Sequence, residues 1–269
     1  MTKRLLNRRK SGPLVFLLAT ALCVMLESVP AFDEFAQRPF FQGGSWAISG
    51  SFHARHKLML YTGPKILIAC TGFSLLVIAI WASFAGPRRK RLLPWRRPAL
   101  LAAAALAIVP SAVGLGKAYS GIYGPVDLVP YGGRHEHVGL VSQLVRFGKP
   151  AGGRSFPAGH ASGGFALMAL SLLPASRRGK RLLFFAGMAA GWGMGTYQMA
   201  RGEHFVTHTL TTMFLALAAV AILSRAFPAK NPRCGSYGRP SCPDDPLLPE
   251  SERRPQDVPP GVPLRSSRT

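Results

Sequence analysis

Apolar residues in this chain gather in blocks of about twenty, and short clusters of basic residues separate the blocks. A helix needs roughly 20 apolar residues to cross the hydrocarbon core of a bilayer. The segments that reach or approach this length are 14–29, 66–85, 99–116, 158–175, 182–199 and 209–226. The pattern therefore predicts an all-α integral membrane protein folded as a six-helix bundle.

The regions outside these blocks predict three domains along the chain. Residues 1–13 form a basic cytoplasmic N-terminus, and residues 14–227 form the membrane domain. Residues 228–269 are rich in Pro, Ser, Arg and acidic residues, which is typical of a disordered tail. Residues 32–57 are expected to be an external loop, with a short interfacial helix carrying Trp46 and Phe52.

Composition and charge support this class and exclude another. Of the 269 residues, 48% are hydrophobic and only 16% are charged, whereas about a quarter of a typical soluble domain is charged. The chain has 33 Lys and Arg against 11 Asp and Glu, a formal net charge of +22. Most of the basic residues fall in the N-terminus, the second and fourth connections and the tail. The positive-inside rule places these segments in the cytoplasm, so orientation explains the charge without a nucleic-acid partner.

The first 31 residues admit two interpretations. A basic start, an apolar run and the sequence Val29-Pro30-Ala31 are also typical of a cleavable signal peptide. We favour an uncleaved first helix. Either interpretation leaves the orientation of every later segment unchanged.

Ionisable residues collect on the predicted external side of the membrane. All seven histidines fall there or at its edge: His53, His56, His135, His137, His160, His204 and His208. Ionisable groups at a helix mouth cost on the order of 2–3 kcal/mol each when they lie deep, so their clustering suggests a site. The strings 117–127, 154–160 and 198–208 reach the same face of the bundle.

This set of residues suits phosphate chemistry. Lys117, Arg154 and Arg201 offer positive charge and donors to phosphate oxygens. The backbone N–H of Gly159, at the start of the fourth helix, adds an anion site. One histidine can attack phosphorus while another protonates the leaving oxygen. His204 and His208 are four residues apart, so one can orient the ring of the other.

The three strings resemble the signature of the type-2 phosphatidic acid phosphatase family, in its membrane-bound bacterial lipid phosphatase branch; the family also has haloperoxidase relatives. Its pattern is Lys, six residues, Arg-Pro; then Pro-Ser-Gly-His; then Arg, five residues, His, three residues, Asp. Here six residues separate Lys117 from Gly124-Pro125, and Pro157-Ala158-Gly159-His160 stands for the second motif. His204, three residues and His208 stand for the third.

The resemblance implies a role for each matched residue. His204 would be the nucleophile that forms a phosphohistidine, and His160 the general acid for the leaving group. Lys117 and Arg201 would bind phosphate, and His208 would orient His204. No cofactor and no metal are implied.

Four positions depart from the family pattern. Gly124 and Gln198 stand where the family has Arg, Ala158 stands for Ser, and His208 stands for the closing Asp. Arg134 or Arg154 is a candidate to replace the phosphate contact that Gly124 lacks. Arg201 lies three residues after Gln198, one turn further along the same face. We interpret the departures as features of a branch and not as inactivation.

The sequence thus predicts a phosphatase in the bacterial inner membrane with its active site at the periplasmic face. Its partner would be a phosphorylated lipid of the bilayer, such as phosphatidate, undecaprenyl diphosphate or lipid A. Phosphate transfer to an acceptor lipid, or binding without catalysis, are the alternatives that use the same residues. A third is an intramembrane serine protease built on Ser162. The sequence does not define an oligomeric state.

Overall fold

The computed structural model describes residues 2–84, 93–145 and 152–226. Helices lie at all six predicted positions, which confirms the all-α membrane fold. They are α1 (Thr2–Glu27), α4 (Gly63–Ser83), α5 (Leu93–Ser120), α7 (Gly159–Ala166), α8 (Arg177–Ala200) and α9 (Val206–Ala226). A 3₁₀ segment, η5 (Leu167–Leu172), continues α7. The tail 228–269 lies outside the described residues.

Fewer helices than the predicted six are long and apolar enough to span a bilayer. Among the described residues, Gly50–Ser83, Leu93–Ser120 and Val206–Arg225 meet this condition, and Gly12–Glu27 meets it together with Pro30–Gln37, across a bend of 87°. The fourth predicted helix does not, because α7 passes into the 3₁₀ segment after eight residues. In α8, several Gly, Trp, Tyr and Gln residues dilute the apolar ones.

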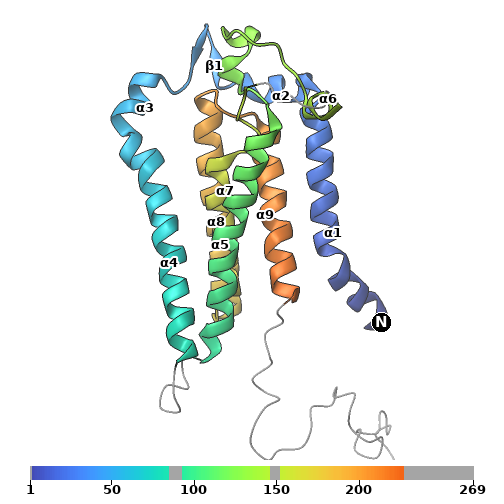
Figure 1. Cartoon of the computed structure of the whole chain (residues 1–269), viewed down its shortest axis with the longest axis vertical. Coiled ribbons are helices and arrows are strands. Elements are labelled where there is room, and N and C mark those ends of the chain that lie inside the picture. The colour runs from blue at the N-terminus through green and yellow to red at the C-terminus, as the bar shows by residue number, and fades with distance from the viewer. Residues whose placement is uncertain (1, 85–92, 146–151, 227–269) are drawn as a thin grey trace, which may run out of the picture. The chain divides into compact units, whose positions relative to one another are not determined.

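Small residues allow the central helices to pack closely. α7 contacts α5, α8 and α9, while α1 lies along α9 and α4 along α5 (Figure 1). A Cβ at Gly164 of α7 would lie 2.6 Å from the Cα of Gly191 in α8, so the two backbones touch. Buried alanines of α5, α7 and α9 fill the core, and the ring of Phe165 packs against Gly191 and Trp192 of α8. Close approach of small residues is a principal source of helix association in a bilayer.

The segment between α1 and α4 is more ordered than predicted. It contains α2 (Pro30–Gln37), a hairpin of β1 (Phe41–Gln42) and β2 (Ser45–Trp46), and α3 (Gly50–Lys57). A π-helical turn, η1 (Leu58–Thr62), joins α3 directly to α4. The expected single helix with Trp46 and Phe52 is therefore wrong, because Trp46 lies in β2 and only Phe52 lies in α3.

Two buried side chains of α2 hold the turn between α8 and α9. The carboxylate of Asp33 accepts hydrogen bonds from the backbone N–H of Thr207, at 3.1 Å, and from its hydroxyl, at 2.5 Å. Gln37 donates to the carbonyl of Met199 at 2.7 Å. Asp33 thus satisfies an N–H at the start of α9 that has no partner within the helix.

The carboxylate of Asp33 should be necessary for stability. We expect Asp33→Ala to lower the free energy of unfolding by about 1–2 kcal/mol, since it leaves a helix N-terminus without its cap. Thermal unfolding in detergent measures the effect, with Glu34→Ala as the control because Glu34 is exposed on the same helix. Equal melting temperatures for the two variants would contradict this role.

Candidate active site

A polar pocket of about 270 Å³ lies where α5 and α8 end and α7 begins. It brings together Lys117, Arg154, His160, Arg201 and His204, which are five of the seven predicted site residues. The remaining residues of its lining are His53, Lys57, Tyr61, Ser155, Gln198 and Glu203.

The other two predicted residues adjoin this pocket. A Cβ at Gly159 would lie 3.3 Å from Cδ and 3.4 Å from Nζ of Lys117, so the lysine side chain passes over the first residue of α7. The ring of His208 is fully buried beside that of His204, with centroids 5.8 Å apart and an interplanar angle of 61°. The two rings touch edge to face, and no hydrogen bond links them in the described part of the chain.

A tight turn places His204 at the pocket. The backbone N–H of Glu203 donates to the carbonyl of Gln198 at 3.0 Å, which ends α8 just before the histidine. Gly202 has a φ of +74°, a conformation that side chains rarely adopt. A Cβ at Gly202 would also lie 2.5 Å from Trp46, so both the backbone and the packing require glycine here.

His204 is a buried, uncharged imidazole close to the cation of Lys117. Its side chain is 2% exposed. Burial lowers the pKa of His204 well below 6.5, and nearby His208, Lys117 and His160 lower it further, while a hydrogen bond to the Ser155 backbone opposes the shift. An imidazole that stays neutral keeps a lone pair for attack on an electrophile.

Hydrogen bonds link four side chains of the pocket in a line. Glu203 accepts from Nη2 of Arg201 at 3.0 Å, and Nη1 of Arg201 donates to Oε1 of Gln198 at 2.9 Å. Nε2 of Gln198 lies 3.1 Å from Nδ1 of His160. Gln198, which stands where the family pattern has Arg, therefore bridges Arg201 and His160.

The backbone explains the departure at Gly124. A Cβ there would lie 2.6 Å from the carbonyl oxygen of Glu203 and 2.9 Å from Oγ of Ser155. No larger residue fits this position without moving the turn before His204. Of the two arginines considered as replacements, Arg154 lines the pocket and Arg134 does not.

Sequence reasoning missed a stripe of four side chains along α3, η1 and α4, of which His53, Lys57 and Tyr61 line the polar pocket. His53, Lys57, Tyr61 and Lys65 recur every four residues along α3, η1 and α4. The ring centroids of Tyr61 and His160 are 4.0 Å apart, and Nζ of Lys65 lies 4.1 Å from the centroid of the Tyr61 ring. The four-residue spacing was the available signal, since it puts side chains on one helical face.

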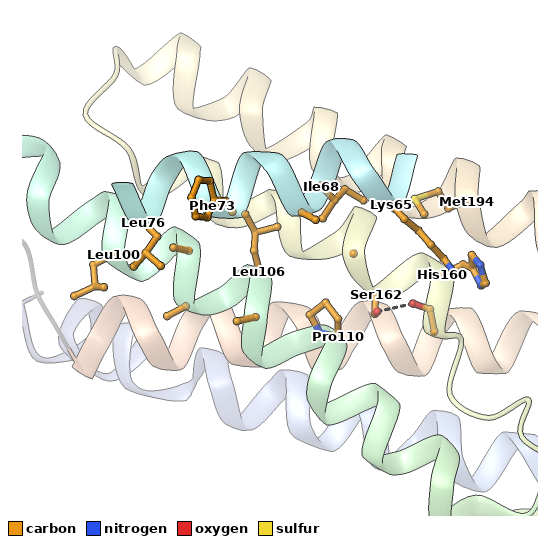
Figure 2. Close-up of a pocket in the computed structure, with 17 residues that line it drawn as sticks. Lys65, Ile68, Phe73, Leu76, Leu100, Leu106, Pro110, His160, Ser162 and Met194 are labelled. Carbon is orange, nitrogen blue, oxygen red and sulfur yellow. Dashed lines mark hydrogen bonds between the residues drawn. The ribbon is translucent and has the colours of Figure 1, made fainter. Parts of the chain in front are cut away.

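A second, apolar pocket of about 600 Å³ lies beside the polar one, between α4, α5 and α7. Figure 2 shows Lys65, His160 and Ser162 at one end, and Phe73, Leu76 and Leu100 towards the other. His160 lines both pockets. The polar pocket and the apolar pocket therefore share one histidine.

Ser162 does not have the surroundings of a protease nucleophile. Its hydroxyl donates to the carbonyl of Gly159 at 2.6 Å, as serines in helices commonly do (Figure 2). Within the described residues, no hydrogen bond joins Ser162 to a histidine. The same residues contain no group of three or more His, Cys, Asp or Glu placed to hold a metal ion.

Comparison with known proteins identifies one family. The family model described as PAP2 superfamily matches residues 98–232, which is half of the chain. All three strings noted in the sequence lie inside this range. Among curated proteins and solved structures, none matches the chain.

The lowered pKa of His204 predicts a stability that depends on pH. In the unfolded chain the imidazole takes up a proton near 6.5, whereas in the folded protein it does so only at much lower pH. The free energy of unfolding should therefore fall as the pH drops below 6.5. Unfolding in detergent at about pH 7.5 and about pH 5.5 tests this, and His204→Gln should lose less stability over the interval. An equal loss in both proteins would contradict the assignment.

Proposed function

Because the chain belongs to the PAP2 superfamily, we propose that it hydrolyses a phosphorylated membrane lipid with His204 as the nucleophile. Membership supports a phosphoester hydrolase of the phosphatase and haloperoxidase type. One observation favours a lipid among the possible phosphoester substrates: His160 lines both the polar pocket and the apolar pocket. A substrate whose phosphate joins an apolar tail matches both pockets at once.

Four groups would bind the reacting phosphate. Lys117, Arg154 and Arg201 supply positive charge within the polar pocket. The backbone N–H of Gly159 opens α7, where the helix dipole favours an anion. Together they would neutralise the charge that builds on the phosphoryl oxygens as the transition state forms.

The reaction would proceed in two displacements at phosphorus. The lone pair of His204 forms a P–N bond while the bond to the leaving oxygen breaks, and His160 gives that oxygen a proton. A water then gives a proton to His160 and attacks phosphorus, the P–N bond breaks, and inorganic phosphate leaves. His208 packs edge-on against His204 and would fix the orientation of its ring.

The lipid tail would lie in the apolar pocket. Most of its residues come from the apolar helices α4 and α5, including Phe73, Leu76 and Leu100. Burial of apolar surface there would contribute about 25 cal/mol per Å². Such contacts favour a long chain without specifying the head group, so phosphatidate, undecaprenyl diphosphate and lipid A stay candidates.

We propose the bacterial inner membrane as the location, with both termini cytoplasmic and the site at the periplasmic face. The basic clusters of the sequence support this orientation through the positive-inside rule. The active-site strings all lie at the ends of the helices opposite to those clusters.

Phosphate release in detergent tests the function. The purified protein should release phosphate from at least one of these lipids in the presence of EDTA, and His204→Ala should lower the rate at least about 1000-fold, since the nucleophile is lost. His56→Ala is the matched control, because His56 is outside the pocket lining. No release from any lipid by the folded protein would instead indicate binding without catalysis.

Filling the apolar pocket should discriminate between substrates by chain length. Ala107→Phe places a ring in the pocket, whereas Ala112→Phe alters the same helix outside it. We expect Ala107→Phe to raise KM for long-chain phosphatidate about tenfold or more, and to change KM for a water-soluble phosphate ester little. Equal effects of the two variants would show that the tail lies elsewhere.

A further inference from the structure

Gln198 sits at the centre of the pocket's hydrogen-bond line, and its surroundings determine which way its amide faces. The side chain is 3% exposed and bonds to both Arg201 and His160. A guanidinium has only donors, so the amide oxygen must face Arg201. The amide nitrogen, also a donor, must then face Nδ1 of His160.

This arrangement sets the tautomer of His160. Nδ1 can take a hydrogen bond from the Gln198 amide only with its lone pair, so the proton of the neutral ring lies on Nε2. Nε2 is buried and has no hydrogen-bond partner among the described residues. The ring therefore offers a free N–H donor at the junction of the two pockets.

The same contact opposes a second proton on His160. An Nδ1–H would point at the amide hydrogens of Gln198, donor against donor. Lys65 of α4, Lys117 of α5, Arg201 after α8 and His53 of α3 also face the ring and disfavour added positive charge. A general acid for an alkoxide leaving group must nevertheless carry both protons.

We propose that Gln198 is a positioning residue that couples phosphate binding at Arg201 to protonation of His160. This inference rests on the proposed function. A phosphate oxygen that accepts from Nη1 of Arg201 replaces Oε1 of Gln198 as its partner. The released amide turns over, and Oε1 then accepts a hydrogen bond from Nδ1–H of His160.

The proton balance follows from this rotation. His160 takes a proton from the substrate's phosphate monoanion, whose second ionisation lies at about pH 6. As the lone pair of His204 bonds to phosphorus, the P–O bond breaks with its electrons on oxygen, and that oxygen takes the Nε2 proton. His160 keeps Nδ1–H against Oε1 of Gln198. Its Nε2 lone pair then accepts a proton from the water that attacks the phosphohistidine. The Nδ1 proton returns to the departing phosphate, which restores the neutral ring.

Substrates with different leaving groups test the coupling. Gln198→Met keeps the volume and removes both hydrogen bonds. It should lower kcat about tenfold or more for short-chain phosphatidate, because the leaving group of this substrate is a poor one, an alkoxide. For 4-nitrophenyl phosphate, whose leaving group needs no acid, the loss should stay below about twofold. Gln143→Met is the matched control, because Gln143 is a half-buried glutamine that bonds the carbonyl of Gly121 and lies outside the pocket lining.

The loss of kcat for phosphatidate, compared with the loss for 4-nitrophenyl phosphate, shows whether Gln198 acts through His160. Equal slowing of both substrates, or slowing of neither, would overturn the coupling and leave the phosphatase intact. If the unaltered protein cleaves none of the candidate lipids and no 4-nitrophenyl phosphate, the proposed function itself fails and the coupling falls with it. The Gln143→Met control should keep the unaltered protein's ratio of kcat for phosphatidate to kcat for 4-nitrophenyl phosphate.

The tautomer can also be observed directly. In protein labelled with ¹⁵N-histidine, with signals assigned by His160→Gln, the resting His160 should carry its proton on Nε2. Saturating inorganic phosphate should move it to a form with a proton on Nδ1, and this change should disappear in Gln198→Met. A resting Nδ1–H form, or an unchanged spectrum when phosphate binds, would overturn the proposal.

Discussion

The hydrogen bonds between Asp33 and Thr207 fix the turn on which the candidate site depends. They join residues 174 positions apart, and they hold the start of α9 against α2. Gln37 holds the end of α8 in the same way, through Met199. Between these two anchors the chain has only the short turn that presents Arg201 and His204. The geometry of the candidate site thus depends on a short helix outside the matched family range.

Once the turn is fixed, burial shapes the chemistry. His204 is enclosed and uncharged next to Lys117, so the proposed nucleophile and a cation that could bind an anion share one small space. The polar pocket ends at His160, where the apolar pocket begins. A phosphate and a hydrocarbon chain have opposite solvation needs, and the two pockets meet both needs on either side of one ring. This juxtaposition explains why we favour a lipid over a soluble ester.

The sequence predicted where the helices lie and that the three strings meet at one face of the bundle. Apolar blocks of bilayer length and charged residues at helix ends leave local signals of this kind. Lys117, His160 and His204 came together as expected. Asp33 could not be foreseen, since no local pattern reveals a contact with Thr207 at such a separation. Nor could the role of Gln198 be foreseen, because it depends on the direction of two side-chain hydrogen bonds and not on spacing.

The most direct test of the account is to trap the covalent intermediate. Protein mixed with a ³²P-labelled lipid substrate, quenched in alkali and digested should yield a phosphopeptide with the label on His204, because a P–N bond of histidine survives base and breaks in acid. Label on His204 that appears within one turnover and is chased by unlabelled substrate is the predicted result. Steady phosphate release without any labelled histidine, or label on another residue, would contradict the account.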